Sequence, residues 1–538
     1  MDGRRFITAA RRTGTSVHTS ISSIDLGIIG AYLVLVLGIG FYTAIRTRTG
    51  EDLFLGGRTL TWGCIGLSLF ASNISSNNLI GLAGAAYTTG ISVSNYEWFA
   101  GVPLIIMAFF YIPLYLKSRI TTIPEFLELR FNRACRTYFS AVTILLSVVV
   151  DTAGGLYAGA LVVKVFYPGA PLLPVCFALA LVAGLYTAFG GLKAVVYTDA
   201  IQAAILLVGS VVLTFILFGK LGFSWATVRE AVPEGHLSLI RPLDDPTLPW
   251  LGTLVGVPVL GFWYWVTNQY IVQRVLGAKN VEHARWGAML AGFLKVVPFF
   301  TMVLPGVMAI KLFPGLKDGD MVYPTMITQV LPVGLVGLVL AGLVSAIMSS
   351  IDSTLNSAST LVVCDFIEPY KPGMPPERVA WLGRITTIVI MVLVASWAPL
   401  IARFGGLFSY LQQAFSILVP PVAAIFLIGP FWKRGNGLAA FATLIIGHVL
   451  GAGLFCLGQM GIWTIHFTIN VGIMTAVSAA AYVGISLVTA PPAPEKVAAC
   501  AWTPALAESA GRVAWYKNYR IHSAVLLAVL ALLLAAFW

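Results

Sequence analysis

Long apolar runs are the feature that most constrains what this chain can fold into. Stretches of about 20 apolar residues, the length that crosses a bilayer as one helix, occur at about fourteen places. Hydrophobic residues make up 58% of the chain and charged residues only 10%, too few to cover a water-soluble surface. The apolar excess must face lipid, so the sequence predicts an all-α, multi-pass protein of the cell (plasma or inner) membrane. The expected spans are residues 27–45, 62–87, 97–116, 138–165, 173–190, 199–218, 251–272, 286–310, 331–363, 378–402, 407–431, 437–457, 465–488 and 521–538.

The remaining composition argues against other classes of protein. The net charge of +11 could suggest a nucleic-acid partner, but the basic residues lie between the apolar runs and form no stripe, so we expect none. The six cysteines are far apart, which favours small buried hydrophobes over a metal site or a disulfide framework. The histidines are scattered and no HExxH, GxSxG or phosphate loop occurs, so we do not expect an enzyme.

The lysines and arginines predict the orientation in the membrane. They are more numerous in one set of alternate loops, and Arg274, Lys279 and Arg285 belong to this set. Because cytoplasmic loops carry the excess of basic residues, these loops are expected inside and both termini outside.

The interruptions of two spans suggest an internal repeat. Ten central spans divide into halves at residues 62–220 and 251–434, separated by an external loop at 221–250. The first span of one half is interrupted at residues 72–78, and that of the other around Gly252, Gly256, Pro258 and Gly261. Paired interruptions of this kind are typical of transporters with a substrate site at the midplane. The alternative is that glycine and serine only allow close helix packing. The flanking parts are a tail at 1–26, a peripheral helix and loop at 27–61, and peripheral helices at 435–538.

Four acids and, away from the span ends, one lysine fall inside the expected spans. They are Glu97, Asp151, Asp199, Lys295 and Asp352. Such groups are costly in a bilayer and usually functional, and one lysine among four acids can be paired. Glu97 and Lys295 also suit a polyol, because a carboxylate accepts from hydroxyls and an ammonium donates to others. The alternative is a structural salt bridge between helices.

A serine-rich run at residues 340–360 indicates a second kind of site. Ala346, Ser349, Ser350 and Ser353 recur at three- and four-residue spacing and share one helix face. Hydroxyls and freed backbone carbonyls are the oxygen ligands that a dehydrated Na⁺ needs, and the interruption near Ile74 would free such carbonyls. Serines on a packing face are equally consistent with this pattern.

Several ordered motifs resemble those of a known family. RTRTGEDLFLGGRTLTWGCIGLSLFASNISS (46–76), NYEWFA (95–100), WYWVTNQYIVQR (263–274) and SAIMSS (345–350) are similar to the sodium/glucose cotransporter group of the solute:sodium symporter family. The resemblance implies a LeuT-type 5+5 inverted repeat of about fourteen helices, acting as a monomer. It also implies sodium-coupled symport of a hexose such as glucose or galactose. Inositol, sialic acid or another polar solute remain alternatives, as do an uncoupled channel and a sugar sensor.

The resemblance also implies roles for individual residues. Sodium would be held by the carbonyls of Ala71, Ile74 and Ala346 and the hydroxyls of Ser349 and Ser350. The sugar position would be formed by Asn78, Glu97, Lys295 and Gln412, with Tyr264 stacking on the ring and closing the inner exit and Trp265 behind it. The outer apolar lid would consist of Leu82, Tyr96 and Phe408.

Four positions near the expected sugar site depart from relatives. Asn78 stands where relatives have Gln or His, and Ala100 where some have Ser. Gly261 stands where some have Asn or Thr, and Asp151 is acidic where a bacterial galactose carrier has Asn. These departures leave the identity of the sugar open.

A second cation is expected among Asp199, Ser349, Asp352 and Ser353. Relatives with a second sodium site have hydroxyl residues at the positions of Asp352 and Ser353, and an acid matching Asp199 completes that site. Two neighbouring carboxylates would repel unless a sodium ion or a proton lies between them. The alternative is that Asp352 pairs with a cytoplasmic arginine.

Overall fold

The computed structural model describes residues 21–167, 169–404, 407–508 and 514–538, and it excludes the side chains of 76–77, 165–166, 402–413 and 499. Most of the expected tail at 1–26 therefore lies outside the described residues. Within them the regular secondary structure is helical, apart from an isolated parallel bridge between Leu60 and Ala278.

The first half of the chain contains helices α2 to α13. Their bounds are Ser23–Ala44 (α2), Gly50–Leu55 (α3), Trp62–Asn73 (α4), Ser76–Thr89 (α5), Asn95–Trp98 (α6), Gly101–Ile106 (α7), Ile112–Lys117 (α8), Ile123–Arg130 (α9), Arg133–Leu145 (α10), Ala153–Phe166 (α11), Leu172–Lys220 (α12) and Trp225–Ala231 (α13). Short π-helical turns such as Leu146–Thr152 join some of them into longer rods.

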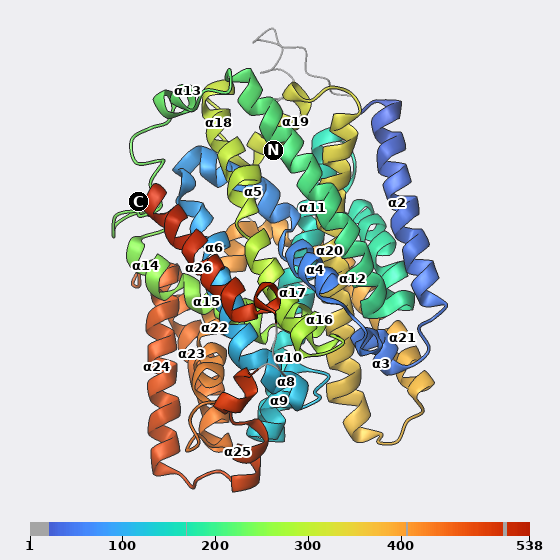
Figure 1. Cartoon of the computed structure of the whole chain (residues 1–538), viewed down its shortest axis with the longest axis vertical. Coiled ribbons are helices and arrows are strands. Elements are labelled where there is room, and N and C mark those ends of the chain that lie inside the picture. Colours follow the sequence, from blue (N-terminus) through green and yellow to red (C-terminus); the bar gives the residue numbers. More distant parts are fainter. Residues whose placement is uncertain (1–20, 168, 405–406, 509–513) are drawn as a thin grey trace.

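The second half contains α14 to α26. Their bounds are Trp250–Val255 (α14), Val257–Phe262 (α15), Gln269–Leu276 (α16), Val281–Leu294 (α17), Leu304–Leu312 (α18), Val322–Val330 (α19), Leu335–Leu361 (α20), Pro376–Trp397 (α21), Leu407–Ile428 (α22), Gly437–Gln459 (α23), Phe467–Val488 (α24), Pro494–Cys500 (α25) and Tyr519–Ala536 (α26). In Figure 1, α4, α12, α16 and α20 lie near the middle, whereas α2 and α24 lie at opposite edges.

The described helices confirm an all-α, multi-pass architecture. Eleven of them are long and apolar enough to cross a membrane. Two expected spans, 173–190 and 199–218, belong to the single 49-residue helix α12, which bends at Gly191. The bend needs glycine, because Gly191 has a φ of 60° and a Cβ there would lie 2.3 Å from the Leu53 carbonyl oxygen.

The interruption predicted at residues 72–78 is present. Helix α4 ends at Asn73, Ile74 is extended with φ −85° and ψ 90°, and α5 begins at Ser76. The Ser75 N–H donates to the Asn73 carbonyl oxygen (3.2 Å) and the Asn78 N–H to the Ser75 carbonyl oxygen (3.0 Å). In a continuous helix these donors would bind the carbonyls of Ala71 and Ile74, so the break frees both carbonyls.

The second interruption lies elsewhere than predicted. The backbone at Gly256 remains helical, with φ −94° and ψ −48°. The chain becomes extended at Asn268, with φ −75° and ψ 125°, between a π-helical turn at Trp263–Thr267 and α16. Gly252 and Gly256 serve close packing instead, because a Cβ at either position would lie 1.9 Å from an oxygen of Thr468 on α24.

Two arginines assigned to loops, Arg274 and Arg285, lie on α16 and α17 and are buried, which corrects their assignment to loops. The side chains of Arg274 and Arg285 are 1% and 0% exposed. Arg285 pairs with Glu282 at 3.0 Å and donates to the Ala108 carbonyl oxygen at 3.2 Å. Hydropathy places such residues outside a span, although the fold supplies acceptors for them inside the protein.

The packing role of Gly256 can be tested by adding one methyl group. Gly256→Ala should lower the free energy of unfolding by about 1–3 kcal/mol, because the new Cβ overlaps the Thr468 carbonyl and α24 must move. Gly453→Ala on α23 is the matched control, since a Cβ there meets nothing within 4 Å. Thermal unfolding of both variants in detergent should show a lower Tm for Gly256→Ala alone; equal shifts would contradict this packing.

Candidate functional site

A buried ion pair forms the centre of the first site. Glu97 on α6 is 3% exposed, and Lys295, directly after α17, is 2% exposed. The Lys295 Nζ contacts the Glu97 Oε2 in an ion pair, as the sequence predicted for a lysine among intramembrane acids. The pair joins residues that are far apart in sequence, and its two charges cancel locally.

The α4–α5 break supplies two asparagines to this pair. The Asn78 Nδ2 donates to the Glu97 Oε1 at 3.1 Å, and the Lys295 Nζ donates to the Asn73 Oδ1. The Ser75 hydroxyl in turn donates to the Asn78 Oδ1 at 3.0 Å. The sequence prediction included Asn78 in the sugar site and omitted Asn73, although both belong to the interruption that it identified.

Aromatic rings form one wall of the site. The Lys295 Nζ lies 5.9 Å from the centre of the Trp265 ring, which is 2% exposed. The Tyr264 ring packs edge-on against Trp265, with ring centres 5.2 Å apart. A cation over an aromatic face is stabilised electrostatically, so Trp265 also supports the lysine charge.

Two small residues lie where α7 approaches α15. Ala100 is 3% exposed, immediately before α7. A Cβ on Gly261 would lie 3.2 Å from the Pro103 Cγ on α7, so Gly261 permits the approach of the two helices.

The remaining predicted substrate and gate residues are Asp151, Leu82, Tyr96, Gln412 and Phe408. Asp151 lies in the π-helical turn Leu146–Thr152 and interacts electrostatically with Tyr264 and Tyr270, and no described contact joins it to Glu97 or Lys295. Leu82 belongs to a buried apolar cluster with Ala71 and Ile74. The Tyr96 hydroxyl is buried and has no hydrogen-bond partner among the described residues. The side chains of Gln412 and Phe408 lie outside the described residues.

Three of the expected sodium ligands belong to one buried cluster beside the same break. They are Ala71, Ile74 and Ala346, and the cluster brings the end of α4 against α20. The carbonyls of Ala71 and Ile74 are the two that the break frees. On α20, the Ser350 hydroxyl donates to the Ala346 carbonyl oxygen at 3.1 Å, so its lone pairs remain available to a cation.

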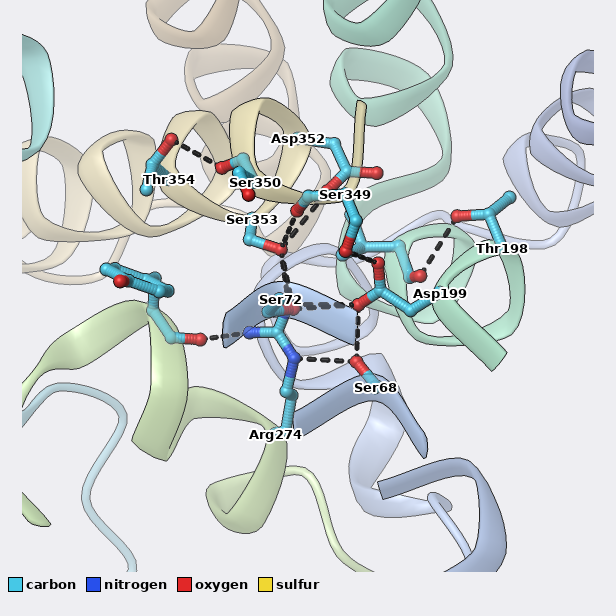
Figure 2. Close-up of polar contacts among 12 residues, drawn as sticks. Ser68, Ser72, Thr198, Asp199, Arg274, Ser349, Ser350, Asp352, Ser353 and Thr354 are labelled. Carbon is cyan, nitrogen blue, oxygen red and sulfur yellow. Dashed lines mark hydrogen bonds and ion pairs between the residues drawn. The ribbon is translucent and has the colours of Figure 1, made fainter. Parts of the chain in front are cut away.

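A second polar cluster contains the four residues expected around a second cation. The Ser349 hydroxyl donates to the Asp199 Oδ1 at 2.5 Å, and the Ser353 hydroxyl contacts the Asp352 Oδ1 at 3.1 Å (Figure 2). The other oxygen of Asp352 accepts from the Tyr186 hydroxyl. Asp199, Ser349 and Asp352 are fully buried.

Arg274, Ser68 and Ser72 also belong to this cluster, and sequence reasoning missed all three. The Arg274 Nη2 lies 3.1 Å from the Asp199 Oδ2, and no ion pair joins Arg274 to Asp352 within the described part of the chain. Ser68 and Ser72 on α4 complete the cluster (Figure 2). Their four-residue spacing, which puts both on one helix face, was the available signal.

Comparison with known proteins identifies the family. Residues 53–447 match the model of the sodium:solute symporter family. The chain belongs to this family. This membership confirms the resemblance found in the sequence motifs.

The curated relatives of this symporter are cotransporters. It is 35% identical to sodium/glucose cotransporter 4 of Danio rerio over 470 residues, which are 80% of this chain and 71% of that protein. It is 33% identical to sodium/myo-inositol cotransporter 2 of Sus scrofa over 538 residues, covering 89% of this chain and 78% of that protein. Family and relatives together support sodium-coupled symport as the activity.

Solved structures confirm the LeuT-type fold of this symporter. It is similar to a Na⁺-coupled sialic acid symporter in a substrate-bound, outward-open state, with a TM-score of 0.78 and 22% identity over 88% of this chain and 99% of that chain. A nucleobase-cation-symport-1 family transporter in a closed conformation is also similar, with a TM-score of 0.54 and 15% identity over 84% and 97% of the two chains. Identities this low support the fold alone.

Proposed function

We propose that this symporter couples sodium entry to the uptake of a sugar or a similar polyol across the cell membrane, by alternating access. One observation carries the proposal: a single helix break serves both candidate sites. The break frees the carbonyls of Ala71 and Ile74 for sodium, and it directs Asn73 and Asn78 to the Lys295–Glu97 pair. A conformational change at the break therefore alters both sites together.

The charge of the buried pair favours an uncharged polar solute. Lys295 is neutralised by Glu97, so no net charge remains for a substrate carboxylate. The same pair offers acceptor and donor groups to hydroxyls, and Tyr264 and Trp265 offer ring faces against which a sugar ring can lie. A solute without matching hydroxyls would leave these buried polar groups without partners. The site should therefore reject such a solute.

This arrangement supports the substrate assignments made from the sequence. Sodium would be held by Ala71, Ile74, Ala346, Ser349 and Ser350. The solute would contact Asn78, Glu97, Lys295, Tyr264 and the residues expected around them. Asn73 joins this set, because it contacts Lys295 from the same break.

Coupling follows from the shared break. If sodium stabilises the conformation in which the pair is poised for substrate, each ligand must tighten the binding of the other by the same factor. An inward membrane potential adds about 2.3 kcal/mol per charge per 100 mV, which corresponds to roughly fiftyfold accumulation per ion.

Uptake into liposomes separates this function from the alternatives. Labelled hexoses and inositols should accumulate above equilibrium only with an inward sodium gradient. A channel would equilibrate them without accumulation, and a sensor would bind without uptake. The best substrate of the panel would identify the solute, and inositol is included because of the cotransporter of Sus scrofa.

Ser350→Ala tests the sodium site. Losing one hydroxyl ligand should lower sodium affinity about ten- to a hundredfold, because a buried ion cannot replace the ligand with water. Ser357→Ala is the control, since this buried hydroxyl on the same helix has no hydrogen-bond partner among the described residues. Sodium activation of uptake should shift in the first variant only; normal sodium affinity in Ser350→Ala would contradict the ligand assignment.

Glu97→Gln tests the substrate site. The change keeps the size of the side chain but removes a charged acceptor worth about 1.5–3 kcal/mol, so substrate affinity should fall roughly ten- to a hundredfold. Glu282→Gln is the matched control, because its partner Arg285 lies on α17 away from the pair. Substrate binding should be measured with sodium binding in the same samples. Unchanged substrate affinity would make the Lys295–Glu97 pair structural.

A further inference from the structure

A cavity of about 390 Å³ lies between the turns that follow α20 and the first turns of α21. Two candidate membrane spans, Leu335–Tyr370 and Pro376–Ile401, are joined here by a loop of five residues. The cavity therefore lies at the level of one membrane surface. It is remote in sequence from the α4–α5 break and shares no lining residue with the sodium and solute sites.

The rim of the cavity carries positive charge. Lys371 and Arg378 line it, and both side chains are exposed. Neither residue forms an ion pair with any residue that the structure describes. The acids of the same segment, Glu368 and Glu377, are not among the lining residues. The cavity thus offers two free cationic groups to an anionic ligand.

One wall of the cavity is held in place by a buried ion pair. Phe366 and Ile367 line the cavity and belong to the π-helical turn Val362–Ile367. Asp365 of the same turn is 0% exposed as a side chain, and its Oδ1 lies 2.7 Å from the Arg136 Nη2. This pair anchors the turn to α10, so the wall is formed before any ligand binds.

The cavity continues into an apolar surface of α21. Leu382 lines the cavity and lies one helical turn before Ile385, which is exposed. Large apolar side chains are exposed along this helix at three- and four-residue spacing, and on a membrane span such a stripe faces acyl chains. The stripe consists of Trp381, Ile385, Ile388, Val389, Val392 and Leu393.

We propose that this cavity binds an anionic phospholipid of the cytoplasmic leaflet, with its phosphate between Lys371 and Arg378 and an acyl chain along the stripe of α21. A third cation supports the charge, because the Arg133 guanidinium lies 4.8 Å from the centre of the Tyr370 ring, which lines the cavity. Free phosphate has the same charged group, but it has no chain to cover the apolar stripe. Basic residues at a cytoplasmic membrane surface attract anionic lipids.

Crosslinking of a lipid probe to the full chain in liposomes tests this site. Phosphatidylglycerol with a photoreactive group on its acyl chain should crosslink to residues 366–393, and phosphatidylcholine with the same group should do so much less. The double variant Lys371→Gln, Arg378→Gln should lower the apparent affinity for phosphatidylglycerol about ten- to thirtyfold, since it removes two charges next to the phosphate. Crosslink yield against the fraction of phosphatidylglycerol measures this affinity.

The matched control is the double variant Lys117→Gln, Lys279→Gln. It removes two other exposed charges that do not line the cavity, so its affinity for phosphatidylglycerol should be that of the wild type. All four side chains are exposed, and both double variants should therefore fold.

Three results would overturn the proposal. An equal loss of affinity in the control would mean general attraction to a basic surface. Equal crosslinking of phosphatidylcholine would remove the role of the anionic group, and displacement of phosphatidylglycerol by millimolar inorganic phosphate would make the ligand a free anion. The proposal goes beyond the proposed function, and the experiment measures no transport. Its failure would leave sodium-coupled uptake unaffected.

Discussion

The break between α4 and α5 is the constraint on which the rest of the site depends. A helix inside a bilayer normally satisfies its own backbone, and freed carbonyls are tolerated only where protein or a cavity surrounds them. Here Ile74 is extended and 0% exposed, so the freed carbonyls of Ala71 and Ile74 are enclosed by α20 and its neighbours. The polar side chains on either side of the break, Asn73 and Asn78, then reach a charged pair that needs partners of its own.

Burial of charge explains why the functional groups also hold the helices together. Lys295, Glu97, Arg274 and Asp199 are all at most 4% exposed as side chains, and each bonds to a partner on another helix. Breaking either pair would leave an uncompensated charge in a medium that solvates it poorly. One pair therefore fixes α6 relative to the end of α17, and the other fixes α12 relative to α16.

The sequence predicted what apolar length and residue chemistry determine. Helical spans, the interruption at 72–78 and the pairing of Lys295 with an acid follow from these, and all are present in the described structure. Sequence reasoning could not predict the features that depend on close packing between helices. The glycines at 252 and 256 suggested an interrupted helix. They are needed instead because Thr468 of α24 lies against Gly252 and Gly256. Arg274 read as a loop charge because its neighbours Asn268, Gln269 and Gln273 lower the local hydropathy, although the surrounding helices supply its acceptors.

The two polar clusters are not independent, because they share two helices. Helix α4 carries Ser68 and Ser72 toward Arg274 and ends in the carbonyls freed by the break. Helix α20 carries Ser349 toward Asp199, and it carries Ala346 into the buried cluster that contains Ala71 and Ile74. The Ser349 hydroxyl donates to one oxygen of the Asp199 carboxylate, and Arg274 pairs with the other oxygen. A displacement of α16 would move the guanidinium away from Asp199 and so disturb the carboxylate to which Ser349 of α20 is bonded. Helix α16, which follows the second interruption, is in this way connected to α4, which ends at the first interruption, and through Asp199 and Ser349 to α20.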